Sequence, residues 1–150
     1  MKLKIVPPLV MLIFGCLMYL VDRFLPVGEF DFFGRREMGN ILLVFGFLII
    51  AIAIFQLKKA KTTTNPLQPG KANQLVMVGI FKYTRNPIYL GMLLFLMALG
   101  LRLGNAFNTL LAAGFVYYMN HFQIAYEEEA LAQKFGKTYQ LYCKAVRRWF

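Results

Sequence analysis

The feature that most restricts the fold of this chain is an apolar run from Ile41 to Leu57 that contains no charged residue. Extended by Asn40, the run makes a helix about 27 Å long at the usual helical rise. That length is close to the thickness of a hydrocarbon core, roughly 30 Å. Lys58, Lys59 and Lys61 follow the run directly. We therefore predict that this segment spans a membrane.

The composition extends this prediction to the whole chain. The 150 residues are 59% hydrophobic, and their mean hydropathy of +0.54 is high for a soluble domain of this length. The formal charge of +10 is compatible with nucleic-acid binding, but most Lys and Arg residues lie between the apolar runs, where membrane topology explains them. We predict a single membrane-embedded domain over residues 1–150 and no nucleic-acid partner.

Three further apolar segments complete the predicted fold. The run Ile5–Val21 accommodates Pro7 and Pro8 in its first helical turn and lacks a small-residue cleavage site after it, so we interpret it as an uncleaved first span. The segments Pro87–Leu101 and Ala106–Met119 are each shorter than a span of about 20 residues. They predict a tight helical hairpin. The expected architecture is all-α and integral to the membrane, with about four transmembrane helices.

The C-terminal tail has a different character. Its apolar and aromatic residues recur at steps of three and four, with Lys and Arg between them. This pattern predicts an amphipathic helix at the membrane interface, divided in two at Gly136. The members of the apolar face are Leu131, Phe135, Tyr139, Tyr142, Val146 and Trp149.

The distribution of Lys and Arg predicts the orientation. With four spans and an internal N-terminus, the inside segments carry thirteen Lys and Arg residues and the outside segments carry four. Positive charge accumulates on the cytoplasmic side of membrane proteins. We therefore expect both termini and the connection from Lys58 to Arg85 to face the cytoplasm, in the inner (plasma) membrane of a prokaryote.

One polar turn enters the third apolar segment and concentrates positive potential. Proline suits the first turn of a helix, and Asn is a favoured residue just before it, so a helix should begin at Pro87 after Asn86. The positive end of that helix and the adjacent Arg85 together favour a carboxylate or a phosphate. Taken alone, this turn is better explained as the charged anchor of a membrane helix.

A longer pattern around this turn resembles a known family. The stretch Gly79–Gly91 is similar to the Gly-x-Tyr-x-x-x-Arg-His-Pro-x-Tyr-x-Gly motif of the isoprenylcysteine carboxyl methyltransferase family, whose core the phospholipid N-methyltransferases share. The tail adds a second match that begins at Glu127-Glu128 and continues through Phe135-Gly136 to Arg147-Arg148. The resemblance covers about residues 69–150. Two motifs in the right order are a more specific signal than either one alone.

The resemblance implies an S-adenosylmethionine-dependent membrane methyltransferase without a separate soluble cofactor domain. It divides the chain into two N-terminal spans (residues 1–68) and a cofactor-binding core (residues 69–150). The implied cofactor residues are Asn73, Gln74, Leu75, Val76, Phe81, Arg85, Asn86, Pro87, Ile88, Tyr89, Glu127 and Glu128. Methyl transfer needs an aligned nucleophile more than an acid or base, so no catalytic residue is assigned.

The resemblance also bears on the methyl acceptor. Asn86 stands where the family has His, Phe81 where it has Tyr, and Gln123 where it has an Arg that contacts substrate. Gln lacks the permanent charge and paired donors with which Arg recognises a carboxylate. We therefore expect a hydrophobic or amphiphilic acceptor, a lipid or prenyl-type molecule, with a neutral nucleophile. Membrane lipid and this acceptor are the expected partners.

Two other classes stay open at this point. A small non-catalytic membrane scaffold could retain the same fold, and a small transporter is a weaker alternative because the spans lack intramembrane charges. Cys16 and Cys143 are far apart in the sequence and predict free thiols, with neither a disulfide framework nor a metal site. His121, the only histidine, is expected to be structural or interfacial. Nothing in the sequence indicates an oligomeric state.

Overall fold

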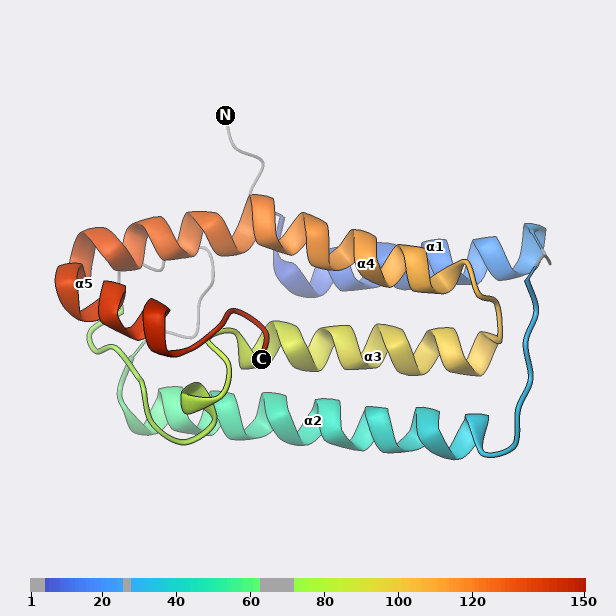
Figure 1. The fold of residues 1–150 in the computed structure, drawn as a ribbon, viewed down its shortest axis with the longest axis horizontal. Helices are drawn as coiled ribbons and strands as arrows, with labels where there is room; N and C mark the ends of the chain where they lie inside the picture. The colour runs from blue at the N-terminus through green and yellow to red at the C-terminus, as the bar shows by residue number, and fades with distance from the viewer. Residues whose placement is uncertain (1–4, 26–27, 63–71) are drawn as a thin grey trace.

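The structure is a computed structural model that describes residues 5–25, 28–62 and 72–150. Antiparallel helices form a bundle in which α1, α2 and α3 lie beside a long rod made of α4 and α5 (Figure 1). The all-α prediction is confirmed for the described residues. In chain order the elements are α1 (Pro7–Phe24), α2 (Arg35–Lys59), the 3-10 helix η2 (Gly79–Lys82), α3 (Pro87–Leu103), α4 (Asn108–Tyr118), the π-helix η3 (Met119–Ile124) and α5 (Ala125–Ala145).

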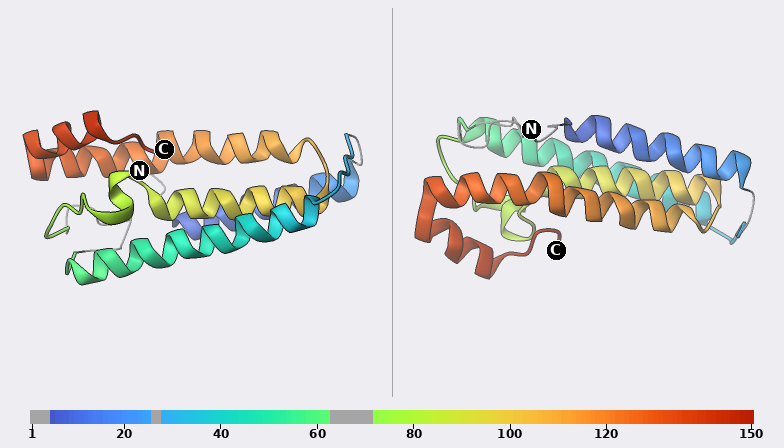
Figure 2. Two further views of the ribbon diagram at one scale, coloured as in Figure 1. Left: turned by 60° about the horizontal axis from the view of Figure 1, so that its bottom comes forward. Right: turned by 90° about the horizontal axis from the view of Figure 1, so that it is seen from above.

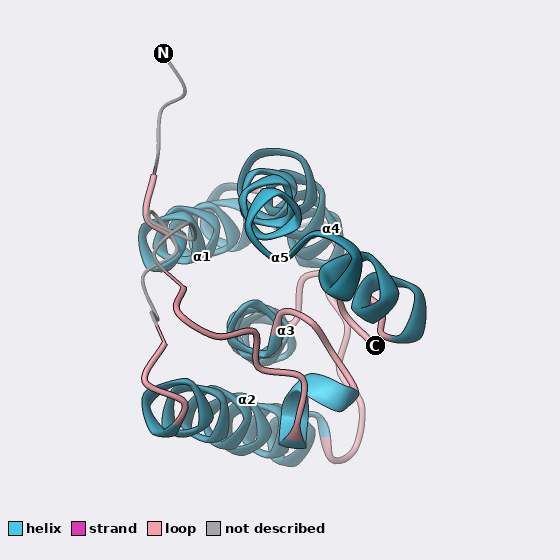
Figure 3. Ribbon diagram, turned by 90° about the vertical axis from the view of Figure 1, so that its left-hand side faces the viewer, coloured by secondary structure: helices cyan, strands magenta, loops and turns pink. Residues whose placement is uncertain are grey.

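Helix α3 lies at the centre of the bundle, as the end-on view in Figure 3 shows. A helix that is apolar on all sides is buried, and α3 carries no charged residue before Arg102 in its last turn. Leu96 of α3 packs in one buried cluster with Met18 of α1 and Phe115 of α4. The more apolar of the two short segments therefore forms the core, with α1, α2 and α4 around it.

Helices α2 and α3 approach most closely at a pair of glycines. A Cβ atom placed on Gly46 would lie 2.9 Å from the carbonyl oxygen of Gly91, and one on Gly91 would lie 2.7 Å from the carbonyl oxygen of Gly46. Both distances are shorter than van der Waals contact, so only glycine fits at this crossing. Gly91, the last residue of the motif, thus allows the two helix backbones to approach closely.

The outer faces of α1 and α2 are unusually apolar for a protein surface. Large exposed side chains include Leu12 and Leu20 on α1 and Phe45, Phe47 and Phe55 on α2. Within the described residues, these two helices are long and apolar enough to cross a membrane, and few of their residues are buried inside the bundle. A hydrocarbon environment explains a surface that would be unfavourable in water. The four-span count stays a prediction.

The helix ends agree with the sequence in most places and differ in one. Pro7 and Pro8 occupy the first turn of α1, and α3 begins at Pro87, as predicted. The charges and glycines of residues 22–39 predict a loop there, but that loop is shorter, because α1 ends at Phe24 and α2 already begins at Arg35 after Gly34, whose φ is 84°. Charged residues at the end of a membrane helix can lie outside the hydrocarbon core of the bilayer. Arg35 and its neighbours can therefore belong to α2 although they precede its apolar run.

The second half of the bundle contains an element that the sequence did not indicate. Helix α4 continues through the π-helix into α5 as one rod, and the last turns of α5 fold back beside it (Figure 2). The reversal occurs at Gly136, where φ is 52° and ψ is −126°, at the predicted break. It brings the tail toward the start of α3, so Tyr139 and Tyr142 are buried against the protein.

The start of α1, the end of α2, the start of α3 and the tail lie at one end of the bundle (Figure 1). These are the parts that the charge distribution assigns to one membrane face. The assignment of that face to the cytoplasm stays a prediction. Residues 1–4, which include Lys2 and Lys4, and part of the connection from Lys58 to Arg85, residues 63–71, lie outside the described residues.

Candidate functional site

A cavity of about 490 Å³ lies at this end of the bundle. Its walls come from segments that are far apart in the sequence, because the loop before α3 and the folded-back tail meet there. The lining residues are Val6, Pro7, Pro8, Ile50, Ile54, Leu57, Thr62, Ala72, Gln74, Leu75, Val76, Phe81, Arg85, Asn86, Pro87, Ile88, Tyr89, Met92, Glu127, Glu128, Leu131, Tyr139 and Tyr142.

The cavity brings together the predicted cofactor residues with one exception. Every one of them except Asn73 lines it. Asn73 is exposed, and its amide donates a hydrogen bond of 3.3 Å to the carbonyl of Lys61. Residues from both motifs thus share a wall, although 35 residues lie between Gly91 and Glu127. Their binding roles stay predictions.

The turn before α3 is shaped by the first residues of the motif. Gly79 has a φ of 61°, a conformation that favours glycine. The backbone N–H of Ile80 donates to Oε1 of Gln56 on α2 at 3.2 Å, which ties η2 to that helix. Phe81 is buried beside Ala53 and Val76. This anchoring places the following residues, Thr84 to Asn86, at the mouth of the cavity.

Asn86 occupies the predicted cap position but does not cap the helix through its side chain. Its Nδ2 donates instead to the carbonyl oxygen of Arg148 at 3.1 Å. The expected Asn cap is therefore wrong in its bonding although right in its position. An asparagine side-chain amide can donate as well as accept a hydrogen bond, and here the carbonyl oxygen of Arg148 in the tail accepts the bond that Asn86 donates.

Glu127 lies in the cavity wall and accepts two hydrogen bonds on one carboxylate oxygen. Its Oε1 receives the hydroxyl of Tyr89 and, at 2.6 Å, Nε2 of Gln123. Burial raises the pKa of Glu127 to about 7, against the lowering effect of those two bonds. The adjacent carboxylate of Glu128 raises it further. A group that titrates near neutral pH and faces a cavity is typical of a functional site.

Gln123 reaches Glu127 from the π-helix. It is 7% exposed and does not line the cavity, so its contact with the site runs through Glu127. The wider turn of a π-helix changes the register of the residues that follow, and such turns occur frequently at functional sites. Its predicted contact with an acceptor remains a prediction.

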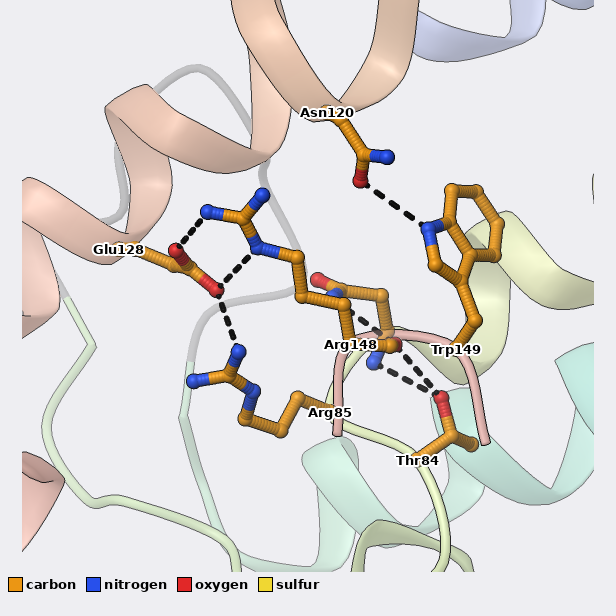
Figure 4. A network of polar contacts seen from close by, with 7 residues as sticks. Thr84, Arg85, Asn120, Glu128, Arg148 and Trp149 are labelled. Atoms are coloured by element: carbon orange, nitrogen blue, oxygen red, sulfur yellow. Dashed lines mark hydrogen bonds and ion pairs between the residues drawn. The ribbon is translucent and has the colours of Figure 1, made fainter. Parts of the chain in front are cut away.

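A cluster of two guanidinium groups around one carboxylate lies beside Glu127 (Figure 4). Glu128 forms an ion pair of 3.0 Å with Arg85 and two bonds, of 3.0 and 2.6 Å, with Arg148. Two positive charges against one negative charge leave the cluster with a positive excess. Moreover, Nε of Arg85 is buried and has no hydrogen-bond partner in the described part of the chain.

Aromatic side chains form a further wall. Tyr142 donates its hydroxyl hydrogen bond to the carbonyl of Phe81 at 2.6 Å, and burial raises the pKa of Tyr142 to about 12, so it stays neutral. Tyr139 lies on the same wall. Tyr83, the motif residue that could also have served an aromatic slot, is instead 76% exposed and does not line the cavity.

Several cavity residues were outside the sequence prediction. Tyr139 and Tyr142 stood out only as members of an amphipathic face, and their spacing did not tell a lipid-facing surface from a folded-back one. The α1 and α2 contributions, such as Pro8 and Ile54, carry no motif. Arg148 was part of the tail match but had no assigned role. His121 is exposed and stacks on Tyr117, and the described residues contain no cluster of three metal-ligating side chains.

Comparison with known proteins gives a family and two relatives. The model of the family described as phospholipid methyltransferase matches residues 34–138. An uncharacterized protein of Haemophilus influenzae is 47% identical over 62 residues, which are 41% of this chain and 98% of that protein. The protein-S-isoprenylcysteine O-methyltransferase of Schizosaccharomyces pombe is 34% identical over 77 residues, 51% of this chain and 33% of that enzyme. The chain thus spans about a third of the S. pombe enzyme's length, and no solved structure matches.

Proposed function

This chain belongs to the phospholipid methyltransferase family, and we propose that it transfers a methyl group from S-adenosylmethionine to a hydrophobic or amphiphilic acceptor at the membrane. The observation that carries the proposal is the cavity. It joins a buried carboxylate, an excess of guanidinium charge and an aromatic wall with the apolar ends of α1 and α2. Few kinds of ligand-binding site require these four features together.

The described residues fit the proposed cofactor. A volume of about 490 Å³ lies within the range of roughly 300–1,000 Å³ that small-molecule sites occupy. The free Nε of Arg85 and the positive excess around it suit a carboxylate, and Glu127 suits an ammonium group. The aromatic side chains of Phe81, Tyr139 and Tyr142 offer an apolar slot for adenine.

The cofactor, when bound, supplies a methyl group on a positively charged sulfur. The chain's own residues have to hold the two reactants in line and keep water away. Glu127 is fixed by Tyr89 and Gln123, so its carboxylate is pre-oriented. Orientation and exclusion of water lower the barrier to methyl transfer, and the proton that a neutral amine, thiol or hydroxyl gives up on methylation leaves to solvent.

The apolar walls indicate where the acceptor binds. Pro8 of α1, Ile54 of α2 and Met92 of α3 line the same cavity, and the exposed faces of α1 and α2 match a lipid environment. An acceptor with a long apolar part would bury it there. Because Gln123 is uncharged and engaged with Glu127, we favour a neutral amine, thiol or hydroxyl nucleophile over a prenylcysteine carboxylate.

Titration with S-adenosylmethionine of the protein purified in detergent tests the cofactor. We expect measurable binding, weakened by Arg85→Ala and unchanged in Glu129→Ala, whose side chain is exposed on the same helix as Glu127. Loss of a hydrogen bond to a charged group costs about 1.5–3 kcal/mol. Absence of binding would favour the scaffold alternative. Labelled-methyl transfer to a lipid extract and to a farnesylcysteine analogue, run side by side, then identifies the acceptor class.

We also propose that the end of the bundle with the cavity faces the cytoplasm of a prokaryotic inner membrane. The bias of thirteen Lys and Arg residues to four supports this orientation. A single cysteine at Gln133, which is exposed near the reversal of α5, should react with a membrane-impermeant reagent only in inverted vesicles. A cysteine at Phe33, in the loop at the other end, is the matched control and should react only from outside. Labelling of Gln133 from outside would contradict the proposal.

A further inference from the structure

The last residues of the chain are bonded to the turn that precedes α3. We call residues 146–149 the C-terminal strap. The backbone N–H of Arg85 donates to the carbonyl of Arg147 at 3.0 Å, and that of Asn86 donates to the carbonyl of Arg148 at 3.2 Å. A segment from the end of the sequence therefore satisfies the backbone at the mouth of the cavity, about sixty positions earlier in the chain.

Side chains strengthen this connection. The carbonyl of Arg148 also accepts from Oγ1 of Thr84 at 3.0 Å and from Nδ2 of Asn86 at 3.1 Å. Nε1 of Trp149 donates to Oδ1 of Asn120 at 3.0 Å, which fixes the strap to the π-helix (Figure 4). Within the turn, the backbone N–H of Asn86 also donates to Oγ1 of Thr84 at 3.2 Å, whereas the Asn86 side chain does not cap α3. The strap thus adds to a bond that the turn makes by itself.

The guanidinium group of Arg148 also affects how much of the positive charge of Arg85 is neutralised by Glu128. Arg148 does not line the cavity, whereas Arg85 and Glu128 do. Glu128 is shared between the two guanidinium groups, and the bidentate pair with Arg148 is the better formed of the two. Without Arg148, Glu128 and Arg85 would form a one-to-one pair, and the positive excess at the cavity would disappear.

We propose that Arg148 is a positioning residue of this cavity. Its guanidinium holds Glu128 so that Arg85 keeps charge for an anionic group of the bound molecule, and its carbonyl helps to fix the turn from Thr84 to Asn86. The identification of that anionic group as the cofactor's carboxylate rests on the proposed function. The chemistry that recognises it is a guanidinium facing a carboxylate.

The test compares two ligands that differ in the amino-acid part, which carries the carboxylate together with the ammonium group. S-adenosylhomocysteine carries the amino-acid carboxylate, and 5′-methylthioadenosine has the adenosine and the sulfur but no amino-acid part. Arg148→Ala should weaken binding of S-adenosylhomocysteine about tenfold and leave 5′-methylthioadenosine within about twofold. Arg148→Lys, which keeps the charge but not the bidentate geometry, should recover part of the loss.

Arg147→Ala is the matched control, because the neighbouring side chain is exposed and only its carbonyl is used. It should leave both affinities unchanged. Equal losses for both ligands in Arg148→Ala would indicate a merely structural strap and overturn the inference, as would an Arg148→Ala variant that behaves like Arg147→Ala. A wild-type protein that binds neither ligand would instead refute the proposed function, and the anion site with it.

Discussion

Replacing Gly91 with valine is expected to lower the free energy of unfolding by about 3 kcal/mol, since overpacking a tight contact is costly and backbone atoms cannot rotate away. The added Cβ would lie 2.7 Å from the carbonyl oxygen of Gly46, so α2 and α3 would have to separate. Denaturation of the purified protein in detergent, followed by circular dichroism, measures this change.

Gly15→Ala is the matched control, because it adds a Cβ to a helical glycine with room around it. The nearest atom would be 3.6 Å away, on Leu99, which is ordinary contact. Alanine favours a helix over glycine by about 1 kcal/mol, so this variant should be as stable as the wild type or slightly more so. Equal stability of Gly91→Val and Gly15→Ala would show that α2 and α3 are packed less closely at Gly46 and Gly91 than the structure indicates.

The Gly91→Val substitution is also expected to change the shape of the cavity. Ile50 of α2 and Met92 of α3 are cavity residues close to this crossing. Separation of the two helices would widen the space between them. The last glycine of the motif is therefore explained by helix packing, while residues 85–89 before it line the cavity.

The fold was predictable where a residue's local chemistry decides its conformation. Proline fixes φ, so Pro87 marks the start of α3 and Pro7 the start of α1. Gly136 could be assigned as the break in the tail because no other residue there adopts a positive φ easily. These are properties of single residues, so they can be inferred from the sequence alone.

The parts that were not predictable depend on contacts between distant segments. The sequence shows Arg85, Glu128 and Arg148 as charged residues but does not say that the carboxylate is shared. Likewise, the amphipathic face with Tyr139 and Tyr142 fits a lipid surface as well as a protein surface, and only the reversal at Gly136 decides between them. The π-helix has no composition of its own that would reveal it.

The affinity for S-adenosylmethionine is expected to increase as the pH rises from about 6 to about 8, because Glu127 has to be ionised to pair with the ligand's ammonium group. Burial raises the pKa of this carboxyl to about 7, so below that value most molecules carry the proton. Binding of a cation favours the ionised form. Each unit of pH below the pKa should therefore weaken binding up to about tenfold.

The groups that face Glu127 do not obscure this titration. Tyr89 on α3 donates its hydroxyl hydrogen bond, and Gln123 on the π-helix is an amide that does not titrate. Glu128, the adjacent charge, is paired with Arg85 and Arg148. The ligand's own α-amine begins to lose its proton at about pH 8, so the increase in affinity should level off there. Glu127 is thus the group whose ionisation should govern the profile.

Replacing Glu127 with glutamine keeps the shape of the side chain and removes both its charge and its titration. This variant should bind the ligand about tenfold more weakly at about pH 8, and its affinity should vary little with pH. Glu129→Gln, on the exposed side of the same helix, should keep the wild-type profile. Calorimetric titration at about pH 6 in two buffers of different ionisation enthalpy provides a second measurement, because the wild type should release a proton on binding. Proton release that persists in Glu127→Gln would show that another group carries the titration and that Glu127 does not contact the ligand's ammonium group.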